Sequence, residues 1–172
     1  MKTPNWLDPE QQAAWRAFLQ TYEHLSAVLG RELLRDSGLS IQDYAVLVEL
    51  SESPEGRMRA FELGRELAWE KSRLSHHMTR MVDRELVKRE KCPTDQRGAF
   101  ISITARGRDA LSAAAPEHVA AVRRYFIDVL SPTDLDTLVE IARKVTSVLS
   151  DSAPCDAETR ESLDERSRPC RQ

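Results

Sequence analysis

The stretch that decides the fold lies in the middle of the chain, at residues 70–108: EKSRLSHHMTRMVDRELVKREKCPTDQRGAFISITARGR. Residues 70–85 have apolar side chains at helical spacing, which places Leu74, Met78, Met81 and Val82 on one face of a helix. Two short segments with strand character follow, at 87–92 and 100–103, and the segment between them contains turn-forming residues. Another helix is expected from residue 105. The predicted order is therefore helix, strand, loop, strand, helix.

The outward face of the first of these helices is rich in hydrogen-bond donors. It carries Lys71, Ser72, Arg73, Ser75, His76, Thr79 and Arg80. A helix fits the major groove of B-form DNA, so we expect Ser72, Arg73 and His76 to approach base edges and the others to meet phosphates. The helical wheel turns His77 toward the apolar side. Taken alone, this face fits an exposed helix with solvated charges almost as well.

The loop between the two strands strengthens the nucleic-acid interpretation. Arg97 is expected at its tip, where a guanidinium can enter the electronegative minor groove. Asp95 is placed to orient Arg97, and Gly98 permits the turn. Lys88 adds positive charge on the preceding strand. Together with the helix, these residues predict a winged helix-turn-helix that binds double-stranded DNA.

Charge is distributed unevenly along the chain. The formal net charge is −3, which alone would argue against nucleic acid. Residues 57–108, however, contain 13 Lys or Arg and 7 Asp or Glu, giving +6, so the remainder carries −9. A basic centre between acidic ends indicates a local phosphate-binding surface.

The flanking segments predict the rest of the architecture. Asp8 caps a long amphipathic helix that ends near residue 36, and its length suits a partner helix, although a core helix of a monomer would look similar. Gly38 suits the end of this helix, and Ser40 and Thr104 suit the starts of later ones. Pro116 predicts a kink or break in a helix that runs to about residue 130.

We therefore expect a mainly α fold with a small β-wing, divided into four regions. Residues 1–36 form an N-terminal arm and dimerisation helix, 37–104 the DNA-binding lobe, and 105–149 the C-terminal dimerisation helices. Residues 150–172 have too few apolar side chains to order themselves and are expected to be a disordered tail.

The run from Asp95 to Gly107, DQRGAFISITARG, resembles the wing signature of the MarR family of bacterial regulators, and residues 70–87 are similar to that family's recognition helix. The resemblance covers about residues 10–150. It implies a homodimer with interleaved terminal helices that binds a pseudo-palindromic operator, usually as a repressor, with Arg97 in the minor groove and Asp95 orienting it.

Many members of this family bind small aromatic or phenolic effectors between the dimer helices and the DNA-binding lobe. The resemblance therefore implies an effector of this kind. Candidate lining residues are Trp15, Tyr22, His24, Tyr44 and Trp69. Core and dimer packing is the competing, and simpler, explanation for these side chains.

Other classes of function find little support in the sequence. The chain has no Gly-rich phosphate loop and no metal-ligand spacing, so we expect neither an enzyme nor a cofactor. A redox-responsive binder using Cys92, a ligand-independent DNA binder and a protein-assembly module remain as alternatives. No long apolar run or secretory leader is present, and a cytoplasmic protein without membrane contact is expected.

Overall fold

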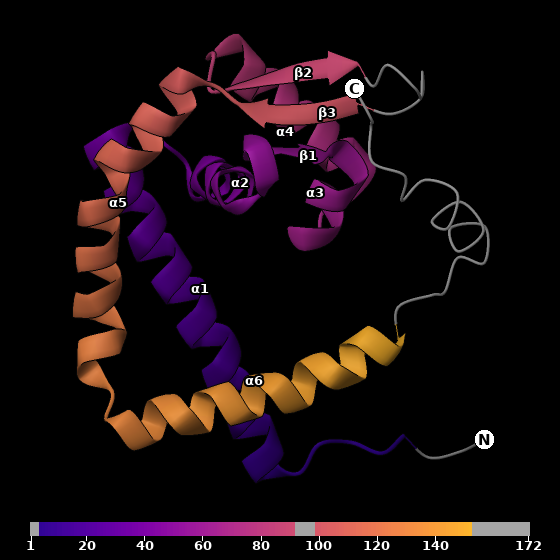
Figure 1. Ribbon diagram of the computed structural model, residues 1–172. Helices are drawn as coiled ribbons and strands as arrows, with labels where there is room; N and C mark the ends of the chain where they lie inside the picture. Colours follow the sequence, from indigo (N-terminus) through magenta and orange to yellow (C-terminus); the bar gives the residue numbers. More distant parts are fainter. Residues whose placement is uncertain (1–3, 92–98, 153–172) are drawn as a thin grey trace. The chain divides into compact units, whose positions relative to one another are not determined.

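The computed structural model describes residues 4–91 and 99–152, which fall into two compact units, Met1–Phe126 and Ile127–Gln172. The elements of the first unit are α1 (Pro9–Ser37), α2 (Ile41–Glu52), the 3-10 turn η1 (Pro54–Gly56), β1 (Arg57–Arg59), α3 (Ala60–Glu66), α4 (Lys71–Asp83), β2 (Val87–Lys91), β3 (Ala99–Ile103) and α5 (Ala105–Tyr125). The second unit contains η2 (Ile127–Val129) and α6 (Pro132–Ser152). Figure 1 shows these elements along the chain.

The fold is mainly helical with one small antiparallel sheet, and this confirms the predicted fold class. The sheet has three strands in the order β1-β3-β2. Strand β3 pairs with β2 through Val87↔Ile103 and Arg89↔Ile101. The two expected strands of the wing are therefore present and pair with each other.

Strand β1 was not expected. Residues 57–59 extend and pair with β3, with Met58 opposite Ile101. Helix α3 begins only after this strand. A strand of three residues with a single apolar side chain has no periodic pattern of its own, because its stability comes from pairing with a segment more than 40 positions later in the chain.

A continuous apolar core joins α2, α3, α4 and the sheet. Its fully buried side chains are Leu39, Val46, Leu47, Leu50, Leu63, Met78, Met81, Val87 and Ile101. The inward stripe predicted for α4 is found in this core, since Leu74, Met78 and Met81 are all buried. The core fixes one face of α4 and leaves the opposite face to solvent.

The expected helix starts are confirmed. Asp8 caps α1 and exchanges hydrogen bonds with Gln11, and Ser40 caps α2 in the same reciprocal way with Asp43. Thr104 caps α5 by accepting from the Gly107 N–H. Such side-chain acceptors satisfy backbone donors that have no partner in the first turn of a helix.

Two boundaries near the C-terminal end differ from the prediction. Helix α5 continues through Pro116 without a break and ends at Tyr125 rather than near residue 130; Figure 1 shows its axis changing direction along its length. Helix α6 extends to Ser152, so residues 150–152, which were assigned to the tail, are helical. Residues 153–172 lie outside the described part of the chain.

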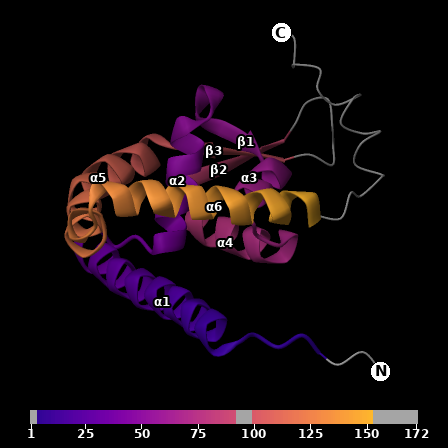
Figure 2. The ribbon, with the colours of Figure 1, turned by 90° about the horizontal axis from the view of Figure 1, so that it is seen from below.

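Helix α1 packs against α5 within the first unit. Near the end of α5, Tyr125 donates a hydrogen bond of 2.7 Å to Glu32 of α1, and Arg124 lies 3.2 Å from the same carboxylate. The N-terminal half of α1 runs clear of the core (Figure 2). Its apolar side chains Trp15, Phe18 and Tyr22 are 52%, 62% and 64% exposed.

Candidate nucleic-acid interface

The side chains of α4 that were predicted to contact DNA are exposed to solvent. Lys71, Ser72, Arg73, Ser75, His76, Thr79 and Arg80 are all exposed. His77 is only 6% exposed, as the helical wheel indicated. The helix thus has a sharply divided surface, with the core on one side and donors on the other.

The two exposed arginines of this face are held by aromatic rings. The Arg73 guanidinium lies over the Trp69 ring at 4.8 Å from its centroid. Arg80 donates a hydrogen bond of 2.8 Å to Nδ1 of His77. Cation–π contacts and hydrogen bonds restrict long side chains that would otherwise sample many rotamers, so both arginines are partly ordered before any ligand arrives.

The N-terminal end of α4 is open to an anion. Glu70 occupies the N-cap position but makes no side-chain capping hydrogen bond, and the first turn contains no acidic residue. Lys71 begins the helix, with Ser72 next to it. Unpaired N–H groups and the positive end of the helix dipole favour a phosphate at this place.

Strand β2 presents two cations in different ways. Lys88 forms an ion pair of 2.6 Å with Glu90, and this contact, together with a hydrogen bond from Ser102, holds the pKa of Glu90 below its usual range. Arg89 points the other way and donates a 2.8 Å hydrogen bond to the Ser75 carbonyl on α4. Successive residues of a strand point to opposite faces, which is why Arg89 and Lys88 have different surroundings. Arg89 was not among the predicted contacts.

Three predicted residues, Asp95, Arg97 and Gly98, lie outside the described residues, as does Cys92. Their assignment to the wing therefore rests on the sequence.

A buried polar cluster behind α4 was also missed. Asp43 is 4% exposed, and its two oxygens lie 3.0 Å from Nε2 of His77 and 2.7 Å from Arg84. In the sequence, the position of Asp43 three residues after Ser40 indicates only a helix cap. Its partners lie 34 and 41 positions away, and no local pattern connects them.

The candidate effector residues do not come together in the first unit. Trp15, Tyr22 and His24 are exposed on α1, Tyr44 is half-buried beside the His118 ring at 4.5 Å, and Trp69 contacts His77 edge-on at 5.1 Å. None of the five lines the cavity found between α1 and α5. That cavity is lined by Glu32, Leu33, Asp36, Ser37, Ala113, Ala114, Glu117, His118 and Ala121.

The cavity measures about 30 Å³, which is room for about one or two water molecules rather than an aromatic ring. Nδ1 of His118 is buried without a hydrogen-bond partner among the described residues, and burial lowers the pKa of this imidazole. An effector would have to enlarge this space or use another one.

Within residues 4–91 and 99–152, no helix is both long and apolar enough to cross a membrane. The same residues bring together no three His, Cys, Asp or Glu side chains in an arrangement suited to a metal ion.

A small antiparallel sheet behind a helix with an exposed, donor-rich face defines a winged-helix regulator of the DNA-binding class. Residues 37–98 match the model of the MarR family. No curated protein matches the chain.

Solved structures extend the match to most of the chain. AbsC, a MarR family transcriptional regulator from Streptomyces coelicolor, is 41% identical over 87% of this chain and 100% of its own, with a TM-score of 0.81. Sco3205, a MarR family transcriptional regulator from the same organism solved in complex with DNA, is 39% identical over 88% of this chain and 95% of its own, with a TM-score of 0.83.

BpsR from Bordetella bronchiseptica, whose DNA binding is regulated by 6-hydroxynicotinic acid, shares the fold at 19% identity, covering 78% of this chain and 98% of its own with a TM-score of 0.68.

The match to the family model and the identities of 41% and 39% to AbsC and Sco3205 show that the chain belongs to the MarR family of transcriptional regulators.

Proposed function

We propose that this protein is a homodimeric repressor that binds a pseudo-palindromic operator through α4 and releases it when a small aromatic or phenolic effector binds. The observation that carries the proposal is the exposed, donor-rich face of α4, on a fold that shares 39% identity with a regulator solved in complex with DNA. The assigned base contacts are Ser72, Arg73 and His76, with Arg97 entering the minor groove.

Two stripes of exposed apolar side chains support the dimer. On α1 the stripe contains Trp15, Phe18 and Tyr22, and the first two rings stack at 5.9 Å. On α6, considered by itself, Val145, Val148 and Leu149 are 54%, 64% and 63% exposed. Helices with exposed apolar faces of this kind are stabilised by a partner helix, and a second copy supplies one of identical shape.

The DNA-binding proposal is tested with duplexes selected from a random-sequence pool by the full-length protein. Binding of the selected duplex is followed by fluorescence anisotropy between about 50 and 300 mM KCl, because the release of counterions from DNA makes affinity fall with salt in about this range. A steep loss of affinity with salt, and weaker binding of a scrambled duplex, are expected. Absent or salt-independent binding would argue for an assembly module instead, and equal affinity for both duplexes would mean binding without sequence preference.

Arg73→Ala separates base contact from backbone contact. If Arg73 donates to a guanine, the variant loses preference at one defined position in each half-site, at a cost of about 1–3 kcal/mol. Arg97→Ala should instead weaken binding to every sequence. A uniform loss for Arg73→Ala, as judged by repeating the selection, would make Arg73 a phosphate contact.

The effector part of the proposal draws on BpsR, whose DNA binding responds to 6-hydroxynicotinic acid. Release of the labelled duplex is measured on titration with 6-hydroxynicotinic acid or phenol, with cyclohexanecarboxylic acid as the non-aromatic control. Release by an aromatic probe supports a ligand-responsive regulator. No release by either probe would leave a DNA binder that does not respond to these two effectors.

A further inference from the structure

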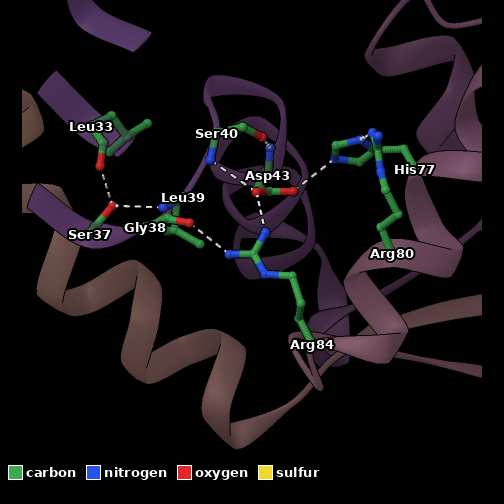
Figure 3. Close-up of polar contacts among 9 residues, drawn as sticks. All are labelled: Leu33, Ser37, Gly38, Leu39, Ser40, Asp43, His77, Arg80 and Arg84. Atoms are coloured by element: carbon green, nitrogen blue, oxygen red, sulfur yellow. Dashed lines mark hydrogen bonds and ion pairs between the residues drawn. The ribbon is translucent and has the colours of Figure 1, made fainter. Parts of the chain in front are cut away.

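The buried cluster around Asp43 connects three elements behind the exposed face of α4. Figure 3 shows Asp43 at its centre, with His77 on one side and Arg84 on the other. Arg84 also donates a 2.8 Å hydrogen bond to the Gly38 carbonyl at the end of α1. The Ser40 N–H donates to the Asp43 oxygen that faces Arg84, at 3.0 Å. The carboxylate is therefore fixed from several directions.

The cluster requires Asp43 to be ionised. Burial alone would raise the pKa of Asp43, but the contacts with His77, the Ser40 backbone and Arg84 outweigh it and hold that pKa well below its usual range. A charged, buried carboxylate with fixed partners cannot move away from the imidazole at low cost. Asp43 is thus a rigid anchor for His77.

The contact between Arg80 and His77 determines which imidazole nitrogen carries the proton. A guanidinium only donates hydrogen bonds, so Nδ1 of His77, 2.8 Å from Arg80, must be an unprotonated acceptor. In the neutral ring the proton is then on Nε2, which faces Asp43 at 3.0 Å. The N–H direction there falls outside strict hydrogen-bond geometry, so we regard the Asp43 contact as mainly electrostatic.

The imidazole plane is fixed by a third neighbour. Trp69 meets His77 edge-on, with ring centroids 5.1 Å apart. His77 is therefore held by Asp43 at one nitrogen and by Trp69 at the ring, and it offers its second nitrogen outward. Arg80 is exposed on the same face of α4 as Arg73 and Ser72.

We propose that His77, anchored by Asp43, is a positioning residue that aims the Arg80 guanidinium at the DNA backbone. The contact with His77 uses one of the five N–H donors of Arg80, and the others are available to phosphate oxygens. The Asp43–His77 pair thus lowers the entropy that Arg80 loses on binding DNA. This inference rests on the proposed DNA-binding function, and its first test does not require DNA.

The first test is nitrogen NMR of the free protein with labelled histidine. The expected spectrum places the proton of the neutral His77 ring on Nε2 and shows Nδ1 as an acceptor. Arg80→Ala should shift the Nδ1 resonance of His77 and leave that of exposed His76 in place. A His77 protonated on Nδ1 in the neutral ring would overturn the proposal, because Arg80 could not then donate to it.

The second test is a double-mutant cycle in DNA affinity, using the selected duplex. The terminal amide of His77→Gln reaches the place of Nε2 but leaves nothing at Nδ1, so Arg80 loses its acceptor. Loss of one such hydrogen bond corresponds to a weakening of about 2–12-fold. In an Arg80→Ala background the same substitution should have almost no effect, whereas in an Arg73→Ala background it should have its full effect.

His77→Asn supplies the conservative comparison. Its side-chain oxygen lies near the place of Nδ1 and can accept from Arg80, so it should weaken binding less than His77→Gln does. Melting temperatures of all variants identify any that fail to fold. Equal losses for His77→Gln in the wild-type, Arg80→Ala and Arg73→Ala backgrounds would mean that His77 is purely structural. If the wild-type protein shows no salt-dependent DNA binding, the proposed function itself fails, and the NMR result stands apart from that.

Discussion

At the scale of single residues, Gly107 lies where separate parts of the chain approach one another closely. A Cβ at this position would lie 2.1 Å from the Leu86 carbonyl oxygen and 3.0 Å from the Ile103 side chain. Gly107 also donates its N–H to the capping hydroxyl of Thr104. The turn between α4 and β2, the end of β3 and the start of α5 can therefore meet here only because this residue has no side chain.

Gly107→Ala should accordingly destabilise the protein. Backbone atoms cannot yield as a flexible side chain would, so the expected loss in the free energy of unfolding is about 1–3 kcal/mol or more. Urea unfolding followed by circular dichroism measures it. Gly30→Ala is the matched control, because a Cβ there meets nothing within 4 Å and removal of a helical glycine should stabilise by about 0.5–1 kcal/mol. A Gly107→Ala protein as stable as the wild type would show that the Leu86 carbonyl can move.

The burial of single residues was predictable from the sequence, whereas their distant contacts were not. The helical wheel correctly separated buried His77 from exposed His76, because direction around a helix depends only on spacing. It could not identify Asp43 as the partner of His77, because that contact depends on how α2 and α4 pack. The contact of Arg89 with the Ser75 carbonyl was likewise beyond the sequence, because it depends on how β2 packs beside α4.

At the scale of elements, reciprocal capping recurs. Asp8 pairs with Gln11 and Ser40 with Asp43. Ser131 and Asp134 exchange the same pair of hydrogen bonds at the start of α6, at 2.9 and 3.2 Å. These starts were predictable from the sequence because the whole motif lies within four residues. The end of α5 and the strand β1 were not, because distant contacts determine them.

Ser40→Ala should lower the stability of the first unit more than Asp8→Ala does. Ser40 accepts from the Asp43 N–H at 3.0 Å, and α2 is packed into the core, so loss of its cap should cost about 1 kcal/mol in the free energy of unfolding. Asp8 caps the exposed first turn of α1, which can fray without disturbing the core. Thermal unfolding of both variants makes the comparison. A larger effect for Asp8→Ala would contradict this and show that the first turn of α1 does not fray independently of the core.

At the scale of the whole molecule, the exposed apolar stripe of α1 bears on assembly. Phe18→Glu places a charge within the stripe and should shift the protein toward monomer, because a buried unpaired carboxylate is costly. Gln20→Glu adds the same charge on the opposite side of α1 and should leave the proposed dimer intact. Sedimentation velocity at several concentrations distinguishes them. A wild-type protein that sediments as a monomer would contradict the proposed homodimer, and two variants that behave alike would remove α1 from its interface.

The pH dependence of global stability should follow Asp43. Its pKa is lower in the folded protein than in the unfolded chain, so its contribution is fully present above the unfolded value of about 3.9 and is lost as pH falls toward the folded value. The wild type should therefore lose stability in acid more steeply than Asp43→Asn, and the difference between them should shrink below about pH 4. Asp83→Asn, at the exposed end of α4, is the control. Parallel pH profiles for the wild type and Asp43→Asn, measured by urea unfolding, would contradict this account.

Helix α1 is continuous over 29 residues, a rod of about 43 Å at the usual rise per residue. Its outer half bears the apolar stripe, and its inner end is fastened to α4 through the Gly38 carbonyl and Arg84. Because α1 is one continuous helix, the direction in which the stripe faces, relative to the end held by Arg84, depends on the number of residues between them. One inserted residue would turn the stripe by about 100° relative to the DNA-binding lobe, whereas four would nearly restore the original phase. Insertions and deletions within α1 are thus constrained to whole turns, even where the identities of the intervening side chains are free to vary.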